Sequence, residues 1–151
     1  FTDEKGIIAA MKPVMEASER LGLWINPSLI ERMPNTLDAH RLLHWAGLEG
    51  AQTPVMAALM RAHWREGRNI SNPDVLVEIG EGAGMDGAVI RRLLASDADR
   101  DTVQAREMHA RQRGVNSVPT FVVADAHVVT GAQPAALWLQ VIDELAGKQH
   151  Q

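Results

Sequence analysis

The chain has 151 residues, of which 46% are hydrophobic and 23% are charged, and these fractions are ordinary for a packed globular domain. Its formal charge of −4 gives no reason to expect binding to nucleic acid or to an anionic membrane, and no apolar run reaches the ~18 to 20 residues that a membrane-spanning helix requires. Because the chain contains no cysteine, its residues cannot form a disulfide, a thiolate metal site or a cysteine nucleophile.

Helix signals dominate the first two thirds of the chain. Residues 4–23 carry apolar side chains at roughly helical spacing, but Pro13 removes one backbone hydrogen bond within this run, so we expect a kinked or broken helix. Residues that cap or open helices predict four further helices, which start after Asn35, at Thr53 and Pro54, after Asn72 and after Asp86. A more polar helix is predicted over residues 97–113 and ends before Gly114.

One face of the helix predicted after Pro54 carries Met56, Met60 and Trp64. We interpret this stripe first as a core-facing surface, because the spacing is typical of any helix that packs on a domain. A pliable apolar groove for substrates is the alternative, since methionine adapts its shape readily.

Strand signals appear only near the C-terminal end. Residues 118–124 and 127–131 predict two strands joined by a tight turn at residues 125–126, and a last helix is predicted from residue 133. The first strand is apolar on both faces, as strands inside a covered sheet are, and a lone two-stranded hairpin is only marginally stable in water. We therefore expect further strands, supplied either by a segment that precedes Phe1 or by a second copy in a homodimer.

Four stretches of the sequence together resemble one known family. They are PNTLDAHRLLHWAG (residues 34–47), RAHWREGRNISNPDVLVEIGEGAGMD (61–86), GVNSVPTFVV (114–123) and VVTGAQPAALWLQVIDEL (128–145). In this order they resemble the DsbA-like thioredoxin-fold oxidoreductases of the FrnE type, a family that also includes the glutathione-dependent 2-hydroxychromene-2-carboxylate isomerases. The resemblance covers nearly the whole chain from Asn35 onward.

This resemblance implies an α/β, thioredoxin-like fold of the DsbA type with a helical insertion domain. Residues 1–113 would form the helical domain, and residues 114–151 would form the C-terminal part of the thioredoxin-like domain, with the cis-proline loop, the hairpin and the last helix. Family members begin with a strand and a Cys-Pro-Trp-Cys-type motif at a helix N-terminus, where the thiolate pKa is lowered. This sequence contains no such motif, so we expect the chain to lack that N-terminal active-site segment.

The resemblance also implies a substrate-binding loop at Pro119. A cis peptide bond before Pro119 would present the backbone of Val118, with Thr120 beside it, to an extended substrate. From the residues alone, a trans proline that opens a strand or blunts an edge is the alternative. Pro119 is therefore the candidate catalytic residue, and Val118 and Thr120 are candidate substrate-binding residues.

A second group of candidate groove residues, Asn35, Thr36 and His40, also comes from the resemblance, because the helix that carries this pattern faces the active-site cleft in relatives. Asn35 is equally well explained as a plain helix cap. His40 and His44 lie four residues apart and could share one helix face, but no third ligand accompanies them at a suitable spacing, so we predict no metal site.

Three functions remain open. The leading one is a DsbA/FrnE-type thiol–disulfide oxidoreductase that acts on protein or small-molecule thiols and disulfides, needs no bound cofactor and could use glutathione as a co-substrate. The second is a glutathione-dependent 2-hydroxychromene-2-carboxylate isomerase, and the third is a cysteine-free interaction module that completes its sheet by dimerisation. A cytoplasmic location is implied by the family alone.

Overall fold

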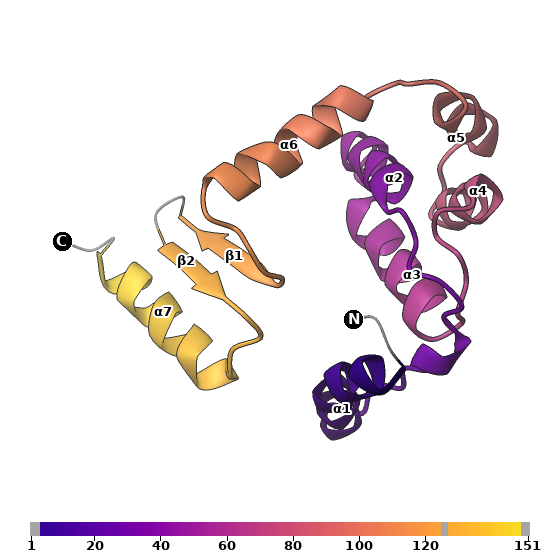
Figure 1. Cartoon of the computed structure of the whole chain (residues 1–151). Coiled ribbons are helices and arrows are strands. Elements are labelled where there is room, and N and C mark those ends of the chain that lie inside the picture. Colours follow the sequence, from indigo (N-terminus) through magenta and orange to yellow (C-terminus); the bar gives the residue numbers. More distant parts are fainter. Residues whose placement is uncertain (1–3, 125–126, 149–151) are drawn as a thin grey trace. The chain divides into compact units, whose positions relative to one another are not determined.

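A computed structural model describes residues 4–124 and 127–148 (Figure 1). Within these residues the backbone forms α1 (Glu4–Arg20), a 3-10 helix η1 (Pro27–Leu29), α2 (Leu37–Leu48), α3 (Gln52–Trp64), α4 (Pro73–Gly82), α5 (Gly87–Leu94), α6 (Arg100–Gln112), β1 (Thr120–Val123), β2 (His127–Thr130) and α7 (Ala135–Lys148). The described chain is thus mostly helical with a two-stranded antiparallel sheet, as the sequence predicts. None of its helices is long and apolar enough to cross a membrane.

The chain divides into two compact units, Phe1–Gln104 and Ala105–Gln151. The boundary between these units falls inside α6. The family resemblance predicts a different boundary, between residues 113 and 114. There the inserted helical domain would end and the thioredoxin-like domain would resume. That division stays a prediction.

The core of the first unit lies among α2, α3, α4 and α5. Its buried apolar side chains are Ala39, Leu42, Leu43, Trp45, Ala46, Val55, Leu59, Ala62, Ile70, Leu76, Val77, Ile79, Met85 and Ile90. Gly80 lies so close to Ile90 that a side chain at position 80 would overlap the end of the isoleucine. Glycine at this position therefore lets α4 and α5 pack directly against each other.

Arg41 is fully buried within the first unit, although arginine is almost never buried without partners. Its guanidinium group donates hydrogen bonds to the carbonyl oxygens of Leu93 (2.7 Å), Ser96 (2.8 Å) and Ala98 (2.8 Å). It also forms an ion pair with Asp38, one turn earlier on α2, at 2.8 Å. These bonds tie α2 to the C-terminal end of α5, where backbone carbonyl groups lack partners within the helix.

Two helix starts lie where the sequence predicts them, and a third does not. Asn72 Oδ1 accepts a backbone N–H at the start of α4, and Asp86 Oδ1 accepts two at the start of α5. α3 already begins at Gln52, so the prediction that Thr53 caps this helix is wrong. Pro54 fits inside the first turn because N–H groups there have no partner within the helix.

α1 runs without interruption from Glu4 to Arg20 and contains Pro13. The break that the sequence allowed at this proline is therefore absent. Proline removes one hydrogen bond from the helix, and the flanking Ala, Met, Lys and Glu residues have high helix propensity, which favours continuation on both sides.

In the second unit, β1 and β2 pair antiparallel in a register that places Thr120 opposite Thr130. α7 contacts this hairpin through Trp138, whose ring meets that of Phe121 edge to face with centroids 4.8 Å apart. The predicted hairpin and last helix are confirmed, and the turn predicted at residues 125–126 lies outside the described residues.

The hairpin is more exposed than its composition predicts. Phe121 and Val122 on β1 remain 42% and 44% exposed, and Val128 on β2 is 56% exposed. Within the described residues β2 is the sole neighbour of β1, so the further strands expected to cover the sheet would come from outside these residues and stay a prediction. Contacts within the described chain do not account for the apolar composition of β1.

Candidate functional site

Hydrogen bonds hold the loop that leads into β1. The peptide bond between Val118 and Pro119 is cis, as the family resemblance implies. The hydroxyl group of Thr120 donates to the carbonyl oxygen of Ser117 at 2.6 Å. The N–H of Gly131, just after β2, donates to the carbonyl oxygen of Pro119 at 2.8 Å. The backbone around Val118 is thus anchored both within the loop and to the neighbouring strand end.

Val118 itself points away from the protein. It is 90% exposed, more than any other large hydrophobic side chain of the described residues. Next to it, β1 pairs with β2 along one edge, and no other strand of the described chain occupies the opposite edge. An exposed loop beside an unpaired strand edge can accept an extended peptide as an added strand.

The second candidate group lies at the N-terminus of α2. Asn35 Oδ1 accepts the N–H of Leu37, the first residue of α2, at 3.0 Å, but Thr36 occupies the N-cap position, so Asn35 lies one residue before the cap that one of its two interpretations assigns to it. The carbonyl oxygen of Thr36 accepts both the backbone N–H of His40 (3.0 Å) and its ring Nδ1–H (2.8 Å). All three candidates are exposed, with Asn35 and Thr36 just before α2 and His40 in its first turn.

The bond from His40 Nδ1 determines which ring nitrogen is available for a ligand. Because a carbonyl oxygen can only accept, Nδ1 carries a proton, and Nε2 is the acceptor of the neutral ring. His44, one turn later, has its Nε2 3.7 Å from a carboxylate oxygen of Asp99. The described residues contain no group of three or more His, Asp or Glu side chains placed to hold a metal ion.

The candidate residues form two groups rather than one. The loop residues belong to the second compact unit, and the three residues of the α2 N-terminus belong to the first. Each group is ordered by its own local hydrogen bonds. Neither contains a thiol, because the chain has no cysteine, so both groups can contact a substrate but neither can exchange a disulfide by itself.

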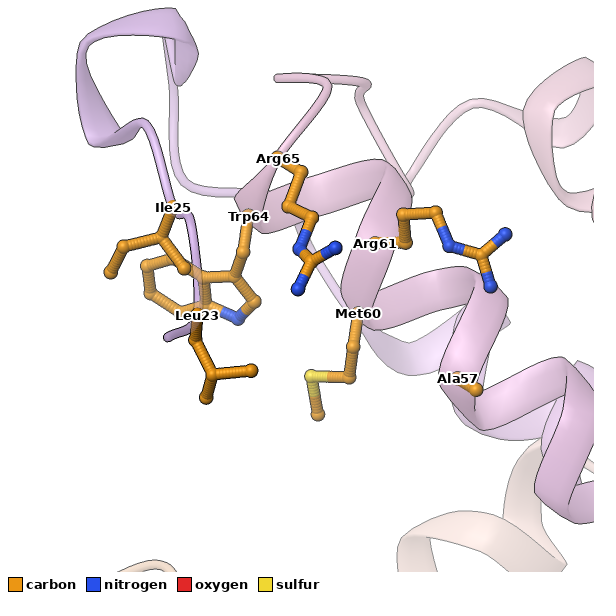
Figure 2. A pocket seen from close by; sticks show the side chains of 7 residues that line it. All are labelled: Leu23, Ile25, Ala57, Met60, Arg61, Trp64 and Arg65. Carbon is orange, nitrogen blue, oxygen red and sulfur yellow. The ribbon is translucent and has the colours of Figure 1, made fainter. Parts of the chain in front are cut away.

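A third feature is a cavity of about 390 Å³ beside α3 (Figure 2). Its lining residues are Leu23, Ile25, Ala57, Met60, Arg61, Trp64 and Arg65. Met56 and Met60 are 40% and 52% exposed, so the core-facing interpretation is wrong for both methionines. The groove alternative fits Met60, and the available signal was the pair of arginines, Arg61 and Arg65, one turn apart beside the apolar stripe.

His63 lies behind this face of α3 and is only 7% exposed. Its ring meets that of Trp64 edge to face, with centroids 4.8 Å apart. Burial lowers the pKa of His63 below its ordinary value of 6.5, because desolvation disfavours the charged ring. His63 is therefore mainly neutral at pH 7.

Comparisons with known proteins agree with these observations. The sequence matches the family described as DSBA-like thioredoxin domain over residues 4–143. YwbO from Bacillus subtilis, an uncharacterized protein, is 28% identical over 120 residues, which are 79% of this chain and 60% of that protein. The crystal structure of a probable DsbA oxidoreductase from Streptomyces coelicolor is similar with a TM-score of 0.83 and 31% identity, over 97% of this chain and 63% of that chain.

The chain therefore spans less than two thirds of the length of both relatives. The family match runs from α1 into α7 and includes the α2 N-terminus and the loop at Pro119. The structural similarity to the Streptomyces protein confirms the fold that the sequence resemblance implies. On this evidence the chain is a member of the DSBA-like thioredoxin domain family.

Proposed function

We propose that this chain is the substrate-binding part of a thiol–disulfide oxidoreductase of the DsbA type and the FrnE subtype. The observation that carries the proposal is the exposed Val118 at the mouth of β1, beside an unpaired strand edge. Family membership and the similarity to a probable DsbA oxidoreductase support the same activity.

In this proposal the loop receives an extended segment of the substrate. The segment pairs with backbone groups at the start of β1, where Val118 leaves room because its side chain is almost fully exposed. Thr120 and Pro119 keep the loop in place through their bonds to Ser117 and Gly131. Substrate affinity would then come from main-chain pairing, which accepts many different sequences.

The α2 N-terminus provides a second proposed contact. Its exposed His40 offers Nε2 as an acceptor, because Nδ1 is already bonded to the carbonyl oxygen of Thr36. Thr36 and Asn35 frame this position. Helices of residues 1–113 would in this proposal act as a lid over the substrate.

Disulfide exchange needs a thiolate that attacks one sulfur of the substrate disulfide and releases the other as a thiolate. The chain has no cysteine, so in this proposal the attacking thiolate belongs to residues outside this sequence. Glutathione is the proposed small-molecule co-substrate. The homodimer and the cytoplasmic location stay predictions.

The proposal is tested by assaying the product of the complete open reading frame for reduction of insulin and of glutathione disulfide. In that protein, Val118→Glu places a charge at the proposed docking loop, and we expect kcat/KM to fall about ten-fold while Tm is unchanged, because an exposed side chain contributes little to stability. Leu48→Glu, at a site that is 76% exposed on α2, is the matched control and should retain full activity.

Three outcomes would overturn the proposal. Equal activity of the Val118→Glu and Leu48→Glu proteins would remove the loop from substrate binding. Glutathione-dependent isomerisation of 2-hydroxychromene-2-carboxylate without any disulfide reduction would favour the isomerase instead, and absence of both activities would favour the interaction module.

A further inference from the structure

The cavity beside α3 combines an apolar surface with positive charge. Five of its seven lining residues are apolar and the other two are Arg61 and Arg65, so no acidic side chain lines it. Leu23 and Met60 leave about half of their surface exposed, at 48% and 52%. Its volume of about 390 Å³ lies within the range of small-molecule sites.

Two contacts fix the walls of this cavity before any ligand is present. The N–H of Asn26 donates to the carbonyl oxygen of Trp64 at 2.8 Å, which holds the segment that carries Leu23 and Ile25 against the end of α3. Gly67 adopts φ +64° and packs directly on Leu29, the last residue of η1. Preformed walls reduce the entropy cost of binding a ligand.

The two arginines differ in their surroundings. In Figure 2 the side chain of Arg65 extends toward the space between Trp64 and Met60, whereas Arg61 extends past Met60 on its other side. Arg61 also lines a neighbouring cavity that contains Glu66 and Glu78, and Arg65 does not. Neither arginine belongs to any ion pair found among the described side chains. Arg65 is therefore the cation best placed to receive an anion from a ligand on the apolar surface.

We propose that this cavity binds a small monocarboxylate with an apolar body. The carboxylate pairs with the Arg65 guanidinium group, whose planar donors match its two oxygens. The apolar body lies against Trp64, Met60 and Leu23. The ligand is an anion because the lining includes two arginines and no acidic side chain. This site involves no sulfur chemistry and goes beyond the proposed oxidoreductase activity.

The test uses the full 151-residue chain with carbon-13 in its methionine methyl groups, of which there are seven. The peak of Met60 is assigned by its loss in Met60→Leu. Sodium 2-naphthoate and sodium decanoate serve as the aromatic and the aliphatic probe, and 2-naphthamide is the uncharged counterpart of the first. We expect a saturable shift of the Met60 peak with at least one acid, and binding of 2-naphthamide at least five-fold weaker than that of 2-naphthoate.

Two variants then test whether Arg65 provides the positive charge that binds the carboxylate. Arg65→Gln should weaken binding about ten-fold, whereas Arg92→Gln, which removes an exposed charge on α5 away from the cavity, should leave it unchanged. Saturation by naphthoate alone or by decanoate alone supports the proposal and identifies the apolar body. Failure of both acids to shift Met60, equal binding of naphthoate and naphthamide, or unchanged binding in Arg65→Gln would each overturn it.

Discussion

Gly67 packs against Leu29 so closely that a Cβ atom at position 67 would lie 2.5 Å from both the Cβ atom and the carbonyl oxygen of Leu29. The residue also has φ +64°, which a side chain disfavours. We expect Gly67→Ala to destabilise the first unit by at least 2 kcal/mol, from roughly 1 kcal/mol of backbone strain plus displacement of η1. Urea denaturation followed by circular dichroism measures this loss.

Gly50→Ala separates the two contributions. Gly50 has φ +74°, but no other atom lies within 4 Å of a Cβ placed there. This variant should lose only about 1 kcal/mol, the cost of the left-handed backbone. If both glycine variants were equally stable, η1 would be able to move away from position 67 at little cost in free energy.

The buried Arg41 should be among the residues most sensitive to substitution. Arg41→Met fills much of the same space but removes the guanidinium donor from the carbonyl oxygens of Leu93, Ser96 and Ala98, of which Leu93 still accepts a bond from the hydroxyl group of Ser96. We expect a loss of roughly 3 kcal/mol in the free energy of unfolding, typical of a broken buried polar network. Arg92→Met, at an exposed position on α5, should change stability by about 0.5 kcal/mol or less. A loss below 1 kcal/mol in Arg41→Met would mean that water replaces the guanidinium group.

His63 should make the stability of the first unit depend on pH. Its pKa is lowered in the folded chain, so below its ordinary pKa of 6.5 the unfolded chain binds more protons than the folded chain. The free energy of unfolding should therefore be greatest above pH 6.5 and should decrease as the pH falls toward the lowered pKa. Urea titrations at pH 7.5 and pH 5.5 measure the difference.

The chain has six histidines, so variants are needed to assign the effect to His63. His63→Phe keeps an aromatic ring beside Trp64 and should reduce the dependence on pH. His109→Phe, at an exposed position on α6, should retain the dependence of the original chain. The assignment to His63 fails if the two variants show the same change between the two pH values.

In the second unit, the edge-to-face contact of Phe121 and Trp138 should contribute to the stability of the hairpin. A double-mutant cycle with Phe121→Leu and Trp138→Leu should give a coupling energy of about 0.5 to 1.5 kcal/mol. Amide hydrogen exchange of β1 is the measurement, because it reports opening of this unit alone. Leu139→Ala, at a position 61% exposed, is the control and should leave amide exchange nearly unchanged. A coupling energy near zero would show that the contact between the two rings does not stabilise the hairpin.

Local signals predicted much of the helical architecture. Asn72 and Asp86 cap their helices as expected because capping needs only a side-chain oxygen and nearby N–H groups of the same turn. The cap predicted at Thr53 and the break allowed at Pro13 are absent, since each residue is compatible with more than one place in a helix. Single-residue signals therefore located the helices better than they located their ends and kinks.

Features that depend on distant contacts were beyond these signals. Arg41 reads as a polar residue within a helix, and its burial became evident only with the carbonyl groups that it meets at the end of α5. The cavity beside α3 likewise requires a segment near Leu23 to lie on residues near Trp64, which no helical period predicts. The local pattern around Pro119 left both a cis and a trans peptide bond open. Only the family resemblance indicated the cis bond and the substrate-binding loop.

The bonds of Arg41 also limit how the chain can be dissected for study. Their backbone acceptors lie 52 to 57 residues after the donor. A fragment that stops before Leu93 would retain an enclosed cation and discard its carbonyl acceptors, and it could not reach the same folded state. The shortest autonomous helical fragment must therefore extend past Ala98, and cloning boundaries for that fragment belong within or after α6.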